Sequence, residues 1–389
     1  MDPFLKLPWF ALKAILIELP DLPTLHRLYQ ASPTIADFLN NFDGMFSEVV
    51  EGILTNQPTC YSPSMQFSFR CCVYLWWRAE GPHNDNPLPE AFGLFMEDLT
   101  FHLPRFITEQ ILVGNLRIIP EINETFRESC GRRPLPRSAP ATYLVRLLEL
   151  SSYVRMRTHK CFHNMLIRCM SVTPQECLER IGPLWPGFSP PMPIDIGPPS
   201  WIEEQRIMVA TVAYQIFFEL KEAVARGTFT VGPSEFHKRC LNENRVRDFW
   251  AKPIDPPPGS MLRFLMLHAR DSIIAVVDWA HTFFELEEPG TSVSSSWASY
   301  CCPETRVAPR LQYMGLQSLN WNPGSIGTVL CSSHHDLYRE VGFPFWSNQR
   351  LLAMGFEVIL NRPHNVPLLG VPLWQNWAAM ALGIDDDGF

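Results

Sequence analysis

Two histidines in the middle of the chain have a spacing that could hold a zinc ion. His159 and His163 lie four residues apart in a stretch with helical periodicity, and Cys161 and Cys169 are near them. This spacing places two imidazoles on one face of a helix, where both can ligate zinc. Lys160 follows His159, so the glutamate of a catalytic His-Glu-x-x-His motif is missing, and the sequence places no second ligand pair nearby. We interpret these histidines as surface or capping residues and predict no metal site.

A second group of residues, near the end of the chain, combines a cysteine with two histidines. Cys331, His334 and His335 are residue types that could form a nucleophilic Cys–His pair. Ser333 is better placed to cap a short helix that begins there, and Asp336 suits the N-terminus of that helix. The sequence has no Gly-x-Ser-x-Gly, Walker A or Gly-x-Gly-x-x-Gly motif. We therefore predict neither catalysis nor a cofactor.

The overall charge and the apolar stretches limit the partners that we expect. The chain has 32 Lys and Arg against 40 Asp and Glu, a net charge of −8 and a pI of about 5.8. A protein with this balance repels a phosphate backbone, so we predict no nucleic-acid partner. The longest apolar stretch, residues 273–284, is shorter than the roughly 18 residues that a membrane helix needs, and Asp278 and His281 interrupt it. We predict no membrane partner.

The opening residues and the cysteines favour an intracellular protein, cytoplasmic or nuclear. Asp2 and Pro8 interrupt the start of the chain, and the apolar segment of a secretory signal does not follow them. The 11 cysteines are an odd number, and two adjacent pairs, at positions 71–72 and 301–302, have a spacing that rarely forms a disulfide. We expect most of these thiols to be reduced and buried.

The prolines predict many short helices. The chain has 36 prolines and only 21 glycines, so the prolines separate helices and do not belong to a flexible linker. Residues 182–199 contain seven prolines, which predicts a surface loop or connector. Ser200 and Glu203 have the spacing of a capping box at the start of a long helix. Beyond residue 56 we predict helices over 88–113, 139–170, 174–181, 200–226, 233–250, 260–288, 334–341 and 347–355, while residues 66–79 fit either a helix or a strand.

The first 56 residues have the pattern of a small helical unit. We predict a first helix over residues 7–19, with Pro8 in its first turn. A second helix follows, and Ser32 and Pro33 have the residue types that begin a third. A fourth helix continues the apolar periodicity up to residue 54. Because helices of about ten residues bury little surface alone, their apolar faces must contact each other and a downstream domain, or another protein.

This opening block resembles the F-box-like segment of a large group of filamentous-fungal proteins. The resemblance lies in a Leu-Pro start, an Ile-Leu pair, an Asp-Leu junction and an Ala-Ser-Pro junction. Here these are Leu7-Pro8, Ile15-Leu16, Leu19-Pro20-Asp21-Leu22 and Ala31-Ser32-Pro33. A weaker similarity to the same group lies at residues 335–355, where an aromatic segment with a Trp precedes an Arg-Leu pair. The first match covers about a tenth of the chain.

The resemblance implies a protein-interaction adaptor. F-box proteins dock a Skp1-type subunit of a cullin ubiquitin ligase and recruit a substrate protein, which here is unknown because the chain has no propeller, leucine-rich or kelch periodicity. As helix-in-groove anchors, the resemblance and the helical spacing suggest Leu7, Pro8, Leu12, Ile15, Leu16, Leu22, Leu25 and Leu28. One departure is that Ala31-Ser32-Pro33 stands where many F-boxes have a Cys or Trp. The alternative is a non-ligase scaffold whose F-box-like segment packs on its own C-terminal domain.

The expected fold class is mostly α. We expect an F-box-like helical unit over residues 1–56, packed on or linked to a larger irregular all-α domain over 57–389 that contains the Pro-rich connector 182–199. Nothing in the sequence predicts a sheet.

Overall fold

The computed structural model describes residues 2–56, 60–80, 88, 91–96, 99, 133–171, 194–251, 272–277, 279–280, 345–346 and 350. Across these ranges the secondary structure is α-helical, which confirms the mostly α fold class. Strand pairing in the same ranges is limited to one isolated bridge, between Ala91 and Val231. Among the helices of these ranges, none has the length and apolar character needed to span a membrane.

The chain divides into two compact units, each built from separated segments. The first unit consists of Met1–Thr158 and Met208–Asp255, and the second of His159–Ile207 and Pro256–Phe389. The predicted F-box-like segment, residues 1–56, lies entirely within the first unit.

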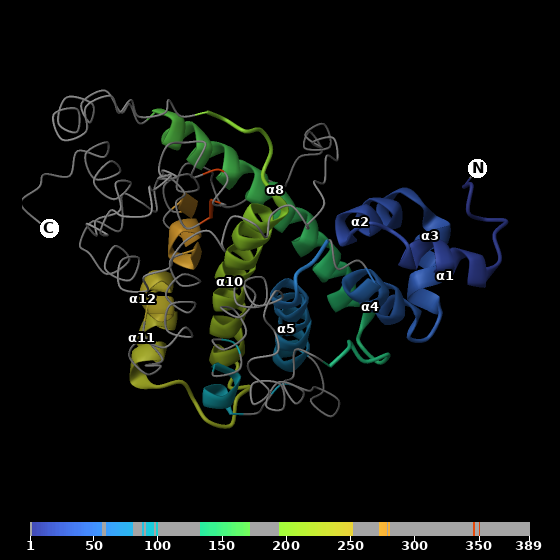
Figure 1. Cartoon of the computed structure of the whole chain (residues 1–389). Coiled ribbons are helices and arrows are strands. Elements are labelled where there is room, and N and C mark those ends of the chain that lie inside the picture. Colours follow the sequence, from blue (N-terminus) through green and yellow to red (C-terminus); the bar gives the residue numbers. More distant parts are fainter. Residues whose placement is uncertain are drawn as a thin grey trace, which may run out of the picture. The chain divides into compact units, whose positions relative to one another are not determined.

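Four short helices at the start of the first unit pack together, and we call them the N-terminal bundle (Figure 1). They are α1 (Trp9–Ile17), α2 (Leu22–Ala31), α3 (Pro33–Asn41) and α4 (Met45–Asn56). Helix α4 contacts each of the other three, and α2 also contacts α3. Helices α1 and α4 approach closely at Gly52, where an added Cβ atom would lie 3.0 Å from the Ile17 side chain. The absence of a side chain at Gly52 therefore permits this helix pair.

Prolines and capping side chains begin these helices largely as predicted. The Asp21 carboxylate accepts a hydrogen bond from the Thr24 amide at 2.8 Å and caps α2. The Ser32 hydroxyl accepts one from the Ile35 amide at 3.1 Å, and Pro33 occupies the first position of α3. The prediction for Pro8 was one position off. Pro8 is the N-cap of α1, with extended backbone, so the helix begins at Trp9.

The longer helices of the chain are α5 (Pro63–Glu80), α8 (Ala141–Ser171) and α10 (Trp201–Ala225). The ambiguous segment 66–79 is thus helical. The predicted capping box at the start of α10 is confirmed, since the Ser200 amide donates to Glu203 Oε2 at 2.8 Å and the Glu203 amide donates to Ser200 Oγ. Helix α10 ends before Gly227, whose φ of +69° suits a residue without a side chain.

The single helix predicted over residues 233–250 is wrong, because two helices lie there. They are α11 (Glu235–Asn242) and α12 (Val246–Ala251). Between them Asn244 has a φ of +55°, a left-handed conformation that asparagine adopts more easily than most residues. The Arg245 amide then donates to the Cys240 carbonyl at 2.8 Å, which closes the turn. Apolar periodicity did not reveal this three-residue break.

Several predicted segments lie outside the described residues. These are residues 174–181 and 334–341, all of 347–355 except position 350, and much of 88–113 and 260–288. Within the last two, the described residues 92–96, 99, 272–277 and 279–280 are helical, as predicted.

Candidate functional site

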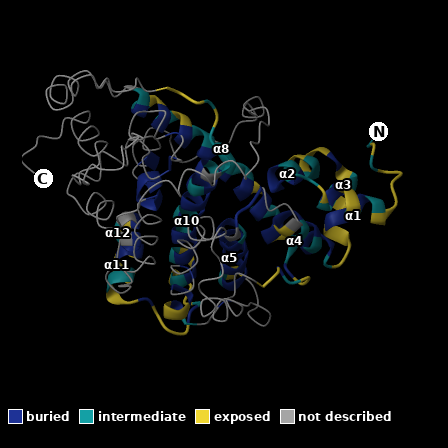
Figure 2. Ribbon diagram, in the orientation of Figure 1, coloured by how far each residue is buried: buried dark blue, intermediate teal, exposed yellow. Residues whose placement is uncertain are grey.

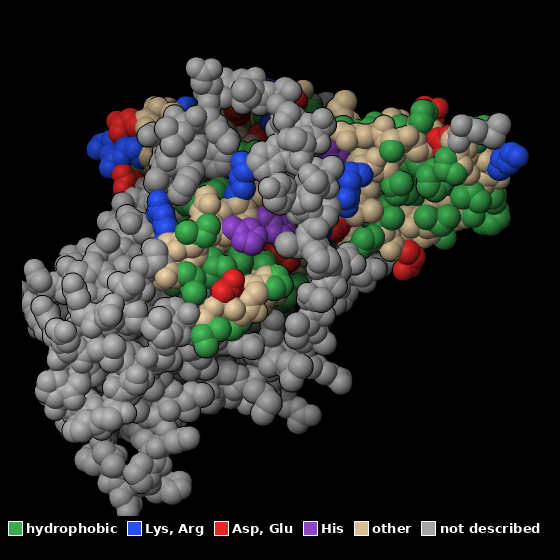
Figure 3. Space-filling model, turned by 90° about the horizontal axis from the view of Figure 1, so that it is seen from above, with side chains coloured by type: hydrophobic (Ala, Val, Ile, Leu, Met, Phe, Trp, Pro, Cys, Tyr) green, Lys and Arg blue, Asp and Glu red, His purple; other side chains and the backbone are tan. Residues whose placement is uncertain are grey.

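Helix α1 and the segment before it carry large apolar side chains that are exposed to solvent. Trp9 is 54% exposed, Phe10 62% and Ile15 43%, and Leu5 and Leu7 are exposed as well. We call these five residues the exposed apolar face. Exposed residues are visible along α1 and the segment before it in Figure 2, and Figure 3 shows hydrophobic side chains gathered over the surface of the N-terminal bundle, at the right.

Helix α1 is apolar on both sides, and only one of these sides is packed. Leu12 and Leu16, four residues apart, are buried within the bundle. Phe10 and Ala14 lie on the side turned away from Leu12 and Leu16, Ile15 lies at the margin of the packed side, and all three are exposed. The only charged residue of α1 is Lys13, which pairs with Glu48 of α4. A helix that is hydrophobic all round is normally buried on all sides, whereas three large apolar side chains of α1 are exposed.

The structure divides the eight predicted partner-binding residues into two groups. Leu7, Pro8 and Ile15 are exposed, and Leu28 is half-buried. The other four, buried within the first unit, are Leu12, Leu16, Leu22 and Leu25. The eight side chains therefore do not form one accessible surface, although all belong to the same bundle. Sequence reasoning did not select Leu5, Trp9 and Phe10, and the signal that could have found Trp9 and Phe10 is the lack of a polar side on α1.

The N-terminal bundle is attached to α8 through its second helix. The Asp21 carboxylate, 5% exposed, pairs with the Arg155 guanidinium of α8 while it also caps α2. One turn later, His26 Nδ1 lies 2.8 Å from Ser152 Oγ of α8. In Figure 1 α2 lies beside α8, in agreement with these contacts. The bundle is thus held by side chains of α2 that are distinct from the exposed apolar face.

A second attachment lies at α4 and at the start of α2. Glu51 pairs with Arg70 of α5, and its carboxylate also accepts the Leu135 amide at 3.0 Å. The Leu22 amide, at the start of α2, donates to the Tyr61 hydroxyl at 2.9 Å. These bonds connect the bundle to parts of the first unit that lie 19 to 84 residues away in sequence. These contacts hold the bundle in the first unit, and none of them involves a residue of the exposed apolar face.

Comparison of the chain with protein-family models, with curated proteins and with solved structures finds no match. The F-box-like interpretation therefore depends on the residues of the opening block and on the surface that they form.

Removing the Asp21 carboxylate will weaken the attachment of the N-terminal bundle to α8. We expect Asp21→Ala to lower the free energy of unfolding by about 2 kcal/mol, because it removes both the α2 cap and the partner of Arg155. Arg155→Ala keeps the cap of α2 and should therefore lower the free energy of unfolding by a smaller amount. Urea unfolding followed by circular dichroism measures both, with Asp37→Ala on the exposed side of α3 as a charge-matched control. Equal stability of Asp21→Ala and the control would show that the attachment contributes nothing.

His26 makes the attachment sensitive to pH. Burial lowers the pKa of His26 below its ordinary value of 6.5, although the charge of Glu149 acts in the opposite direction. Below pH 6.5 the unfolded chain therefore binds a proton that the folded chain resists, so the free energy of unfolding falls on acidification. We expect His26→Gln to flatten this dependence between pH 7 and pH 5. Chemical unfolding of both proteins across that range measures it, and parallel curves would contradict it.

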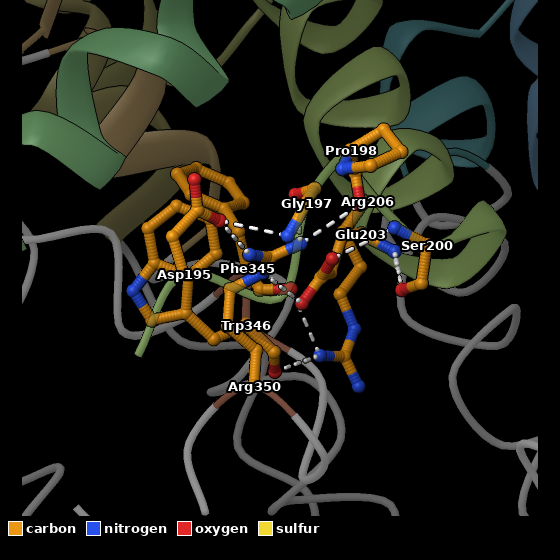
Figure 4. Close-up of polar contacts among 9 residues, drawn as sticks. All are labelled: Asp195, Gly197, Pro198, Ser200, Glu203, Arg206, Phe345, Trp346 and Arg350. Atoms are coloured by element: carbon orange, nitrogen blue, oxygen red, sulfur yellow. Dashed lines mark hydrogen bonds and ion pairs between the residues drawn. The ribbon is translucent and has the colours of Figure 1, made fainter. Parts of the chain in front are cut away.

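The second unit contains a buried arginine with several partners, drawn in Figure 4. The Arg350 Nε atom donates to Glu203 Oε1 at 3.0 Å, and both residues are fully buried. Its two terminal nitrogens reach the Asp195 carboxylate and the carbonyl oxygens of Gly197 and Pro198 at 2.9 to 3.4 Å. This cluster, which we call the Arg350 hub, joins the end of the Pro-rich connector to the start of α10.

Aromatic rings and a second arginine complete the Arg350 hub. The guanidinium of Arg350 lies over the Phe162 ring at 4.8 Å, and Phe162 meets Trp346 edge to face. Arg206 Nη1 donates to the carbonyl oxygens of Phe345 and Trp346 at 3.2 and 2.8 Å. Burial lowers the pKa of Arg206 to about 10, which still leaves it charged at neutral pH. Because Arg350 and Glu203 are fully buried, we interpret the hub as structural. Trp346 and Arg350 belong to the segment of weaker similarity noted in the sequence.

The histidines and cysteines of the second unit do not assemble a reactive site in the part of the chain that is described. The rings of His159 and His163 lie 6.4 Å apart, and no group of three potential metal ligands exists among the described residues. Burial raises the pKa of Cys169 to about 12, and it raises that of Cys161 further, so both remain thiols at neutral pH. Cys331, His334 and Asp336 lie outside the described residues.

The six cysteines of the described ranges share one environment. Each is a buried free thiol: Cys60, Cys71, Cys72, Cys161, Cys169 and Cys240. This agrees, for these six, with the expectation of reduced and buried cysteines.

Proposed function

We propose that the protein is an F-box-like interaction adaptor without catalysis of its own. In this proposal the N-terminal bundle docks a Skp1-type subunit of a cullin ubiquitin ligase, and the remainder of the chain recruits a substrate protein. The observation that carries the proposal is the group of large apolar side chains that are exposed on α1 and on the segment before it, beside the buried Leu12 and Leu16. The residue pattern of the opening block supplies the class of partner.

The composition of the exposed apolar face suits a protein interface. Trp9 and Phe10 are aromatic residues of the kind that dominate interface energetics. Removing a large apolar side chain from water contributes about 1.5–3 kcal/mol, so five of them can exceed the cost of association, which is at least several kcal/mol. A helix that buries one apolar side in a partner's groove is also a recurrent mode of recognition.

Co-purification tests the proposal. The full chain and a Skp1-type subunit, mixed at micromolar concentration, are expected to elute together in size-exclusion chromatography. Substitution of Leu7, Trp9 and Ile15 by alanine should separate them. Elution of the wild-type chain and the subunit as independent species would contradict the proposal.

The alternative function is a non-ligase scaffold, and specific observations favour it too. The Leu22 amide donates to the Tyr61 hydroxyl and Glu51 pairs with Arg70, so the bundle contacts the chain beyond residue 56. The bundle is also tied to its own chain by the Asp21–Arg155 pair. A scaffold of this kind retains no Skp1-type subunit, whether or not the exposed apolar face is intact. The size-exclusion experiment therefore distinguishes the two functions.

A further inference from the structure

The segment before α1 is fastened to the start of α3 by one carboxylate. Asp2 Oδ2 accepts a hydrogen bond from the Ser32 hydroxyl at 2.5 Å and another from the Thr34 amide at 3.1 Å. Asp2 Oδ1 accepts the Phe4 amide at 2.9 Å. Ser32 also caps α3 through the Ile35 amide, so its hydroxyl both donates and accepts. Residue 2 is thereby held next to a helix that begins about 30 residues later.

The electrostatics of this contact favour an ionised carboxylate. The N-terminus of α3 presents unpaired amides and the positive end of the helix dipole, and an anion is stabilised there. The hydrogen bond from Ser32, followed by that from the Phe4 amide, lowers the pKa of Asp2 to about 2. Asp2 is therefore fully charged at neutral pH. Two backbone bonds, from Leu5 to Asp2 and from Leu7 to Phe4, then fold the chain into turns that lead to α1.

Burial does little to hold this segment in place. Leu5 is 65% exposed and Leu7 is 37% exposed, so these side chains contribute few packing contacts that could fix the backbone. The hydrogen bonds of Asp2 are the contacts that connect the segment to a different helix of the bundle. Without them, the first two members of the exposed apolar face would lose their fixed position relative to Trp9 and Ile15.

We propose that Asp2 is a positioning residue for the exposed apolar face: its carboxylate fastens the preceding segment to the start of α3 and so preorganises Leu5 and Leu7 for the partner. The inference rests on the proposed function, because the partner is the Skp1-type subunit. Preorganisation matters because a segment that is ordered before binding loses less conformational entropy on association. Asp2 itself touches only its own chain.

Affinity and local order are measured on the full-length chain and its variants. Asp2→Ala removes every side-chain acceptor at this position, whereas Asp2→Asn keeps one oxygen that can accept the Ser32 or Thr34 donor but loses the charge. Asp37→Ala, at an exposed position of α3, is the control for loss of one negative charge. Calorimetric titration with the Skp1-type subunit gives the affinity. Hydrogen exchange of the peptide covering residues 2–10 gives the order of the segment in the free protein.

The inference predicts a graded result. Asp2→Ala is expected to weaken binding about tenfold and to speed exchange in residues 2–10, with an unfolding midpoint equal to that of the wild type. Asp2→Asn should recover part of the affinity and slow exchange in residues 2–10 to the same extent, while Asp37→Ala changes neither. Equal affinity of Asp2→Ala and wild type would overturn the positioning role alone. If the wild-type chain does not bind the subunit, the proposed function is wrong and the positioning role is overturned with it.

Discussion

Substitution of Leu7, Trp9 and Ile15 together by alanine is expected to weaken binding of a Skp1-type subunit by more than 100-fold, roughly the loss of 3 kcal/mol or more. All three side chains are at least 37% exposed in the free chain. Surface substitutions of this kind usually change stability by about 0.5 kcal/mol or less each. Titration calorimetry of the triple variant, together with its urea unfolding curve, measures both quantities. Retained affinity would show that the partner binds elsewhere.

Leu16→Ala is the matched control, because it removes an aliphatic side chain of the same size as Ile15 from the next position of α1, which is buried. Leu16 is fully buried, so its truncation leaves a cavity and should cost about 2–5 kcal/mol of stability. Leu16→Ala is thus expected to impair folding and Ile15→Ala to impair binding, although the two positions are adjacent. If Ile15→Ala unfolds as readily as Leu16→Ala, the side chain of Ile15 belongs to the core and not to a docking face.

Arg350→Met is expected to destabilise the second unit strongly. It removes Arg350 as the ion-pair partner of the fully buried Glu203 and as the donor to the carbonyl oxygens of Gly197 and Pro198. Breaking a buried pair on one side typically costs about 3–5 kcal/mol, because a desolvated charge remains. Equilibrium urea unfolding, followed by circular dichroism, measures this loss.

The double variant Arg350→Met with Glu203→Gln separates the contribution of the ion pair to stability from the contribution of the other contacts of Arg350. Removing both charges avoids the isolated carboxylate, so we expect the double variant to be more stable than Arg350→Met alone. The residual loss then reports the carbonyl contacts and the stacking on Phe162. A loss below about 1 kcal/mol in Arg350→Met would contradict the hub as a structural centre.

Features determined by nearby residues were predictable from the sequence. Ser32 with Pro33, and Ser200 with Glu203, begin helices because each cap bonds to an amide within three residues. The α-helical class follows from apolar periodicity, which the described ranges confirm. The break at Asn244 was missed because the apolar spacing continues across it, and the left-handed turn depends on a single residue.

Features that depend on distant contacts were not predictable. Helix α1 has apolar residues on every side, so periodicity could not separate the buried Leu12 and Leu16 from the exposed Ile15. The pairing of Arg350 with Glu203 spans 147 residues, and that of Arg155 with Asp21 spans 134. Each has many competing partners in the sequence. The predicted partner-binding residues therefore combine exposed and buried side chains of the N-terminal bundle.

Hydrogen exchange of the full chain with and without a Skp1-type subunit tests the central claim most directly. If the exposed apolar face is the binding surface, the subunit will slow amide exchange in residues 4–17. Amide exchange in α8 and α10 will stay unchanged. Protection confined to other helices, or no protection at saturating subunit, would contradict the claim that this face binds a ligase subunit.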